Sequence, residues 1–384
     1  MSSAKREYIN RTKKEFYKEI KKYQSTLKPT REIEGYGSLP IVGEKGYPNV
    51  YTHSISNQDE KSSYAYANEL IKRKYKEVIK SKAKNILGST QDSYIKKVNN
   101  KITKELQDIY KARRPIEFSS QFENELKFDK ILTNKVAGIM GSKNSLQKLE
   151  ATQNIPTSKT IEHFTQDDIK SKEAVITLYE KGLPEQQIIS ILSLGSFGIS
   201  YNRKLVPTRW AISAYDQTIE KHLHKKLLHY KTIERYEVYN YKDKGNEFVI
   251  ILFPDTFSAE VIESFSKIIE QDYVDVENKL HKKEPETAGG FYATKLAVFE
   301  SLFERKRQAS IISIRVIEDY ELPLGVVFVR ESVRETMKNR KFVTHSKIEL
   351  EKYLHDKFFK HFNLYFDSQT RKEALRVRKL NQYF

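Results

Sequence analysis

The hydropathy pattern of the chain changes its period after His229, and no other part of the sequence limits the fold as strongly. Residues 233–241 and 247–253 are rich in β-branched and aromatic side chains, and Asp243-Lys244-Gly245-Asn246 separates them. Two such segments around a glycine-containing turn are typical of a β-hairpin, because glycine reaches the left-handed conformations that tight turns require. The second half of the chain must therefore contain an antiparallel sheet.

Further elements are predicted around this hairpin from their periodicity. We expect helices at residues 258–271, 287–306, 331–338 and 345–361, and strands at residues 273–277, 309–317 and 325–330. The chain as a whole is therefore expected to be α+β. A helical N-terminal part precedes a mixed, largely antiparallel sheet with packed helices.

The first half of the chain shows helical rather than strand patterns. Residues 59–87 and 91–113 are polar with sparse apolar positions, which predicts two helices, and Pro115 ends the second because it lacks a backbone donor. Residues 157–164 are expected to form an exposed loop or edge strand, and residues 171–194 a packed helical hairpin. We expect four regions: a basic N-terminal helix or arm (1–33), a mainly helical region (34–155), an α+β region (156–365) and a C-terminal tail (370–384).

Composition restricts the class of partner. Lys and Arg total 68 against 51 for Asp and Glu, a net charge of +17 that favours nucleic acid as a partner, with an acidic protein as the weaker alternative. The chain has no cysteine, which excludes disulfides and cysteine-bound zinc. The N-terminus lacks the apolar segment of a secretory signal and no segment is long enough to span a bilayer, so we expect a cytoplasmic protein with no membrane partner.

The segment from Arg203 to Trp210 is the strongest candidate for nucleic-acid binding. Arg203, Lys204 and Arg209 bring three cations next to the only tryptophan, Trp210, at the expected start of a helix. Charge beside a stacking face suits single strands and flipped bases. In the alternative interpretation Trp210 is buried and held by an arginine cation–π contact.

A second group of candidates lies near residue 300. Gly289 and Gly290 open a predicted helix and are candidates for phosphate binding, although the pattern favours tight helix packing, because the third glycine of a dinucleotide-binding motif and its βαβ context are missing. Arg307 follows the same helix and is a further candidate for DNA binding. Other arginines on neighbouring elements predict a cationic concave surface, namely Arg305, Arg315, Arg330 and Arg334.

The catalytic candidates form a weaker pattern. Glu162, His163, Asp167 and Asp216 offer imidazole and carboxylate groups that suit a divalent metal, and such a metal would be needed by a nuclease. In the alternative interpretation these groups cap helices and form surface ion pairs. No other cofactor is indicated.

The chain end is basic and carries three apolar side chains. Leu380, Tyr383 and Phe384 fall on one side of a short helical turn, which is typical of a peptide that docks into a groove of a partner protein. The alternative is a tail that packs on its own core.

Several of these segments together resemble the archaeal Nre family of DNA repair proteins. The similar segments are Gly46-Tyr47-Pro48, residues 159–164, residues 203–210 with Asp216 after them, Gly289-Gly290, residues 307–310 and residues 323–326. The resemblance implies a role in DNA repair and a C-terminal peptide that binds the sliding clamp PCNA. Leu380, Tyr383 and Phe384 match that peptide, whereas Val377 stands where a glutamine is usual. Many members carry an N-terminal four-cysteine zinc module, which this chain lacks.

Two functions from different classes remain open on the sequence. The first is a repair factor that binds DNA and docks on PCNA. The second is a metal-dependent nuclease or nucleotide-processing enzyme acting in DNA repair. A nucleotide or RNA ligand held at Gly289 and Gly290 is a third interpretation.

Overall fold

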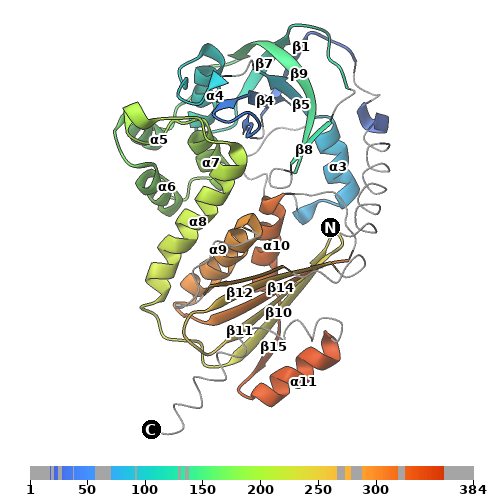
Figure 1. Ribbon diagram of the computed structural model, residues 1–384, viewed down its shortest axis with the longest axis vertical. Coiled ribbons are helices and arrows are strands. Elements are labelled where there is room, and N and C mark those ends of the chain that lie inside the picture. Colours follow the sequence, from blue (N-terminus) through green and yellow to red (C-terminus); the bar gives the residue numbers. More distant parts are fainter. Residues whose placement is uncertain are drawn as a thin grey trace. The chain divides into compact units, whose positions relative to one another are not determined.

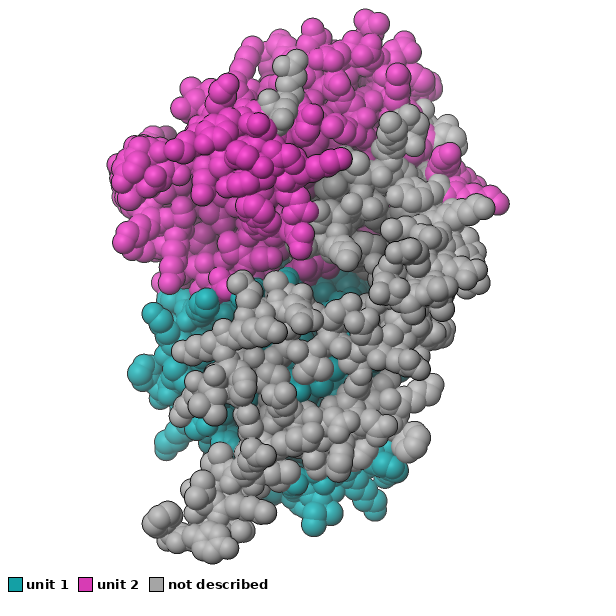
Figure 2. All heavy atoms as spheres, viewed as in Figure 1, with its two compact units in different colours: residues 1–12, 220–321, 328–384 teal, residues 13–219, 322–327 magenta. Residues whose placement is uncertain are grey.

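The chain divides into two compact units, which Figure 2 shows in different colours. The computed structural model describes residue 18 and residues 21–24, 28–37, 39–56, 71–90, 93–128, 131–134, 138–265, 273–277, 288–318 and 325–358. Unit 2 comprises residues 13–219 and 322–327, and unit 1 comprises residues 1–12, 220–321 and 328–384. The division near residue 220 lies well after the boundary at residues 155 and 156 that the sequence suggests. Among the described residues, no helix is long and apolar enough to cross a membrane.

Unit 2 is built on a seven-stranded sheet with the order β1-β7-β9-β5-β4-β2, in which β8 also pairs with β9. Figure 1 shows this sheet beside helices α4 and α7. Its strands are β1 (Glu32–Tyr36), β2 (Ile41–Val42), β4 (Thr52–Ser56), β5 (Ile86–Ser89), β7 (Glu117–Phe122), β8 (Ile131–Asn134) and β9 (Gly138–Ala151). A separate ladder joins β3 (Asn49–Val50) to β6 (Ser93–Tyr94). The helices are α3 (Tyr75–Ala83), α4 (Lys101–Lys111), α5 (Lys159–Gln166), α6 (Ser171–Glu180), α7 (Glu185–Ser193), the short 3₁₀ helix η1 (Ser200–Asn202) and the start of α8 (Thr208–Leu227).

The expectation that residues 34–155 are mainly helical is wrong, because most of the sheet of unit 2 lies there. All of its strands except β9 are short, and buried hydroxyl and amide groups interrupt the apolar alternation by which a strand is recognised. The hydroxyls of Ser56 on β4 and Ser120 on β7 are hydrogen-bonded to each other at 3.1 Å. The Gln24 amide donates to the Ser142 hydroxyl at 2.6 Å. These hydrogen bonds satisfy polar groups that the core would otherwise not tolerate.

The helical predictions for unit 2 have a mixed outcome. The hairpin at residues 171–194 is confirmed by α6 and α7, whose buried residues include Leu178 and Ile188. Residues 159–166 form α5 rather than the expected loop or edge strand. This helix buries Ile161 and Phe164 one turn apart, a stripe too short to be distinctive in the sequence.

Unit 1 is built on a six-stranded sheet with the order β13-β12-β14-β11-β10-β15. All its pairings are antiparallel except that of β12 with β14, so the expected mixed, largely antiparallel sheet and the α+β class are confirmed. The strands are β10 (Tyr236–Asp243), β11 (Asn246–Phe253), β12 (Ala259–Phe265), β13 (Tyr273–Glu277), β14 (Ser310–Ile317) and β15 (Arg340–Thr344), and the helices are the end of α8, α9 (Ala288–Glu304), α10 (Val326–Lys338) and α11 (Lys347–Lys357).

The predicted hairpin forms two adjacent inner strands of this sheet, β10 and β11. Asp243 pairs with Asn246, and Lys244 and Gly245 between them have φ angles of 47° and 71°. Both values are left-handed, as a two-residue hairpin turn requires. Every residue of β11 is buried because helices cover both faces: Val249 and Ile251 pack with Leu350 of α11, whereas Phe248 on the other face contacts Phe328 of α10.

Two predictions in unit 1 are wrong in type. Residues 258–271 were expected to be helical, but β12 runs from Ala259 to Phe265 between β13 and β14. Residues 325–330 were expected to form a strand, but they begin α10. The start of α10 is buried nearly all round, and a short apolar segment of that kind has no periodicity that separates helix from strand.

Candidate nucleic-acid interface

The glycine-rich loop of unit 2 presents an exposed tyrosine. It connects β2 to β4 and is closed by a hydrogen bond from the Gly43 amide to the Tyr51 carbonyl at 2.8 Å. Gly46 has a φ of +89°, and its carbonyl accepts from the Asn49 amide at 2.9 Å. This left-handed position favours glycine. Tyr47 follows it at the turn and is 43% exposed.

The segment from Arg203 to Pro207 is held in place by its backbone. The Leu205 amide donates to the Ile95 carbonyl at 2.8 Å, and the Ile95 amide donates to the Pro48 carbonyl at 3.0 Å. Ile95 therefore joins the glycine-rich loop to this segment. A Cβ on Gly195 would lie 2.5 Å from the Lys204 carbonyl oxygen, so the close approach of these two backbone segments requires glycine.

Thr208 connects the first turn of α8 to the glycine-rich loop. Its hydroxyl donates to the Pro40 carbonyl at 3.1 Å and accepts from the Val42 amide at 2.8 Å. It also lies 3.0 Å from the Ser193 hydroxyl. Its side chain thus contacts the strand β2 and the helix α7. It fixes the start of α8 against the strand that leads into the loop.

An apolar cluster lies beneath these segments. It joins residues from the loop and its strands, from the chain after β6 and from the Arg203 segment. Its members are Val42, Val50, Ile95, Val98 and Leu205, all buried. Because burial of several such side chains stabilises a packed arrangement, the loop and the Arg203 segment form one rigid support.

Tyr47 and Trp210 meet on top of this support. Their ring centroids lie 5.0 Å apart at an interplanar angle of 53°, and Trp210 is 44% exposed. The alternative in which Trp210 is buried is therefore wrong. Arg209 is exposed beside the pair, with its Nη1 atom 3.4 Å from the Glu44 carboxylate. We call the surface formed by residues 43–51, 93–98 and 203–210 the aromatic platform.

The aromatic platform is strongly cationic. Six cations stand against one carboxylate, Glu44; the cations are Lys45, Lys96, Lys97, Arg203, Lys204 and Arg209. All but Arg203 are exposed, and among the described residues only Arg209 forms an ion pair. The Arg203 guanidinium donates to the carbonyls of Gly198 at 2.9 Å and Asp167 at 3.3 Å. Unneutralised cations beside exposed rings suit a phosphate backbone with accessible bases.

Two more exposed tyrosines belong to the aromatic platform. Tyr94 lies on β6, and Tyr51 closes the glycine-rich loop. The Lys143 ammonium of β9 lies 4.2 Å from the Tyr51 ring centroid. His53 stacks on Tyr51 from within the sheet, and its Nδ1 atom has no hydrogen-bond partner among the described residues. Burial, with a smaller effect from Lys143, lowers the pKa of His53 to about 4.

The four catalytic candidates are not brought together. His163 and Asp167 form an exposed ion pair at 2.9 Å, and Glu162 accepts from the Gln166 amide one turn along α5. Asp216 is instead completely buried within α8. Among the described residues, no group of three or more histidine and carboxylate side chains is arranged to hold a metal.

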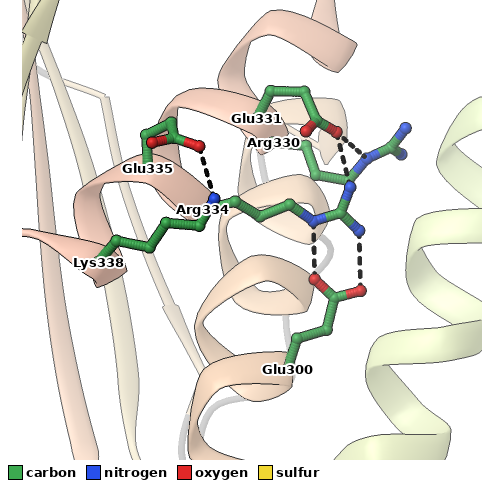
Figure 3. A network of polar contacts seen from close by, with 6 residues as sticks. All are labelled: Glu300, Arg330, Glu331, Arg334, Glu335 and Lys338. Atoms are coloured by element: carbon green, nitrogen blue, oxygen red, sulfur yellow. Dashed lines mark hydrogen bonds and ion pairs between the residues drawn. The ribbon is translucent and has the colours of Figure 1, made fainter. Parts of the chain in front are cut away.

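The arginines of unit 1 do not form the expected cationic surface, because carboxylates face them. Figure 3 shows Arg334 of α10 between Glu300 of α9 and Glu331. It makes two hydrogen bonds of 2.8 Å to Glu300 and one of 2.6 Å to Glu331. Arg330 is fully buried, 3.8 Å from the same Glu331. Arg315 is held by the Glu263 carboxylate at 2.9 Å.

Arg305 is neutralised in the same way. Its two Nη atoms donate to the Glu237 carboxylate at 2.8 and 2.6 Å, and the Tyr239 hydroxyl also donates to Glu237. Burial acts to raise the pKa of Glu237, but the hydrogen bonds from Arg305 and Tyr239 outweigh it and lower that pKa. Burial and the bond to Glu237 raise the pKa of Tyr239 to about 12. This cluster is therefore an ion pair within unit 1 rather than a binding surface.

Gly289 and Gly290 begin α9 as expected, but a carboxylate lies beside them. A Cβ on Gly290 would lie 3.0 Å from a Glu263 carboxylate oxygen. This arrangement favours the packing interpretation over phosphate binding. Arg307, in the turn after α9, donates to the Lys306 carbonyl and forms no ion pair among the described residues. Leu380, Tyr383 and Phe384 lie outside the described residues, as do residues 1–17, 19–20 and 25–27 of the basic arm.

The sequence pattern identifies Arg209 and Trp210 but not the side chains that they contact. Tyr47 belongs to a segment in which Gly46 and Pro48 both favour turns, so its exposure is readable from the sequence. The contact between Tyr47 and Trp210 is not readable from the sequence. The two rings meet through tertiary contacts, such as the hydrogen bond from Val42 to Thr208, which joins residues 166 positions apart. Nothing in the sequence around Tyr51 and Lys143 indicates that the ammonium group of Lys143 lies over the Tyr51 ring.

Comparison with known sequences tests the resemblance to the Nre family. The model of the N-terminal region of archaeal Nre matches residues 10–268, and the model of the C-terminal region matches residues 277–383. DNA repair protein NreA of Archaeoglobus fulgidus is 28% identical over 313 residues, which cover 78% of each chain. NreA of Haloferax volcanii is 28% identical over 337 residues, or 82% of this chain and 80% of that protein.

NreB of Archaeoglobus fulgidus is 36% identical over 187 residues, which cover 46% of this chain and 47% of that protein. No solved structure matches the chain significantly. Because the match to the N-terminal model alone spans more than half of the sequence, the chain belongs to the archaeal Nre family.

Proposed function

We propose that the protein acts in DNA repair by binding DNA at the aromatic platform of unit 2. A role in DNA repair is supported by family membership and by relatives that are named DNA repair proteins. The observation that carries the DNA-binding proposal is the contact between Tyr47 and Trp210 beside Arg209. Two segments that are distant in the sequence thereby place rings and a cation on one surface.

The charge of the aromatic platform supports phosphate contacts without base-specific readout. Its lysines are exposed and form no ion pairs among the described residues, so they are available to phosphate oxygens. Each cation that neutralises a phosphate releases counterions, and affinity then depends strongly on salt. We therefore expect non-sequence-specific binding that weakens steeply as salt increases.

This proposal is tested with a fluorescently labelled oligonucleotide and the full chain. Anisotropy titrations at increasing salt should give a straight decline of log affinity against log salt, with a slope of about −0.7 to −0.9 for each phosphate contacted. Several contacts should produce a slope of several units. Absence of binding at low salt contradicts the proposal.

We further propose that the C-terminal peptide docks on the sliding clamp PCNA. Leu380 is followed at the third and fourth positions by Tyr383 and Phe384, a spacing that places the three side chains on one side of a helical turn. The basic residues before them suit an acidic partner surface. Val377, in the usual place of glutamine, removes one polar contact and leaves the apolar anchors.

Removal of Tyr383 and Phe384 tests the docking proposal. We expect the shortened chain to lose binding to PCNA from the same organism in a pull-down or calorimetric titration, while circular dichroism and DNA affinity stay unchanged. Unchanged affinity for the clamp would refute the docking role.

A further inference from the structure

Exposed rings lie on adjoining segments of unit 2, and two of them, Tyr47 and Trp210, contact each other. Tyr47 and Trp210 are each a little under half exposed, and Tyr51 and Tyr94 lie on the segments next to them. Apolar area of this kind at the surface of a folded protein marks a contact with a ligand. The planar face of a nucleobase is the complement of such rings, and one stacked base contributes about 1–3 kcal/mol.

The rings are also held in fixed positions before any ligand arrives. Thr208 ties the first turn of α8 to Pro40 and Val42, and Ile95 ties the loop at Pro48 to the Arg203 segment. A preorganised surface loses less conformational entropy on binding than a flexible one. The support beneath Tyr47 and Trp210 therefore favours a stacking role over a passive exposure of the rings.

We infer that the aromatic platform recognises unpaired DNA bases in single-stranded regions, an inference that rests on the proposed DNA-binding function. In an intact duplex both faces of each base are covered by neighbouring bases, so the rings would gain nothing from stacking. In a single strand the faces are open, and the rings can stack while the surrounding lysines contact phosphates. The same surface thus distinguishes the two forms of DNA.

Trp210 gives this inference a direct readout, because it is the only tryptophan in the chain. Titration with a single-stranded oligonucleotide should change its intrinsic fluorescence as bases stack on the indole. A duplex of the same sequence should bind at least about 5-fold more weakly, the lower limit for the loss of one stacked base. It should also leave most of the fluorescence unchanged.

An abasic strand of equal length separates base from backbone recognition on the unaltered protein. It keeps the phosphates and should bind as weakly as the duplex, without the fluorescence change. Trp210→Ala should lower affinity for the single strand at least about 5-fold and leave duplex affinity unchanged. Ile348→Ala, which removes an exposed apolar side chain of unit 1, serves as the matched control and should alter neither affinity.

The outcomes separate this inference from the proposed function. Equal affinity for single strand, duplex and abasic strand overturns recognition of bases and leaves DNA binding in place. Preference for the single strand without any change in Trp210 fluorescence overturns the assignment to the aromatic platform. Absence of binding to all three overturns both proposals.

Discussion

Unit 2 and unit 1 expose different kinds of side chain. In the described part of unit 2, the exposed large apolar residues are all aromatic, namely Tyr47, Tyr51, Tyr94, Tyr201 and Trp210. Those of unit 1, among the described residues, are the aliphatic Leu228 and Ile348. Most cations of the aromatic platform form no ion pair with the residues that the structure describes, whereas Arg305, Arg315 and Arg334 of unit 1 are bound to carboxylates.

This difference shows that net charge alone does not locate a binding surface. An arginine that is mostly buried and held at 2.6 to 2.9 Å by a carboxylate contributes little attraction for phosphate, because its charge is neutralised and inaccessible. Exposed lysines beside exposed rings can contact both parts of a nucleic acid. We therefore assign DNA contact to unit 2 and interpret the arginine clusters of unit 1 as stabilising its fold.

The largest expected effect concerns the stability of unit 1. Arg334→Met removes the ion pairs of Arg334 with Glu300 and Glu331 from a largely buried site, so we expect the free energy of unfolding to fall by about 3 kcal/mol. Urea denaturation measures the loss. Lys338→Met on the same helix removes a cation that is 69% exposed and should cost less than about 0.5 kcal/mol.

Measuring the DNA affinity of the Arg334→Met variant tests whether the Arg334 cluster also contacts DNA. If the Arg334 cluster only stabilises the fold, the folded Arg334→Met variant should bind DNA as tightly as the unaltered protein. A weaker affinity in the folded variant would show that unit 1 contributes to the DNA surface and would break the contrast between the units.

A second prediction concerns the acid stability of unit 2. The pKa of His53 in the folded chain is about 4 against an unfolded value of 6.5, so the neutral imidazole is the form that the folded state favours. As the pH falls below about 6.5, the unfolded chain takes up a proton that the folded chain does not, and stability is lost down to about pH 4. The loss is about 3 kcal/mol in total.

Unfolding titrations between pH 7 and pH 4 measure this loss. His53→Phe keeps a ring next to Tyr51 but cannot titrate. The free energy of unfolding of this variant should therefore lack the loss of about 3 kcal/mol that His53 causes between pH 6.5 and pH 4. An unchanged pH dependence in the variant contradicts the burial of a neutral His53.

Thr208→Val should have a smaller effect on stability and a visible one on binding. The variant keeps the shape of the side chain but leaves the Val42 amide and the Pro40 carbonyl without the hydroxyl, at a cost of about 1–3 kcal/mol. DNA affinity should fall several-fold as the first turn of α8 loosens from the loop. Thr208→Ser keeps the hydroxyl and should preserve affinity; equal affinity in both variants argues against a rigid support.

The smallest effect is expected for Gly290→Ala. The added methyl group approaches a flexible Glu263 carboxylate at 3.0 Å, and a helix tolerates alanine well, so stability should change by less than about 1 kcal/mol. DNA affinity should not change. A marked loss of affinity would restore the phosphate-binding interpretation of this glycine pair.

Local signals in the sequence predict some features of the molecule and long-range contacts decide the others. The hairpin around Lys244 and Gly245 was predictable because its turn chemistry is local. The sheet of unit 2 was not, because its strands bury hydroxyls such as Ser56 and Ser120 that read as polar surface. The start of α10 was mistaken for a strand because its burial on all sides removes any helical period.

The same distinction holds for the candidate site. Arg209 and Trp210 were identified from one short segment, whereas their partners Glu44 and Tyr47 come from the glycine-rich loop. For the arginines of unit 1, the sequence shows the positive charges but not the carboxylates that neutralise them. Glu300 and Glu237 reach those arginines only through tertiary packing.

The most direct test of the assignment to unit 2 compares two arginines of similar exposure. Arg209 is 52% exposed and lies 3.4 Å from Glu44 in unit 2, while Arg340 is 50% exposed and lies 3.9 Å from Glu237 in unit 1. Arg209→Gln and Arg340→Gln remove the same charge, and anisotropy titrations of one oligonucleotide at two salt concentrations compare them. We expect Arg209→Gln alone to weaken binding and to reduce the salt slope by about 1. Equal losses in both variants, or a loss only in Arg340→Gln, would contradict the assignment of DNA contact to unit 2.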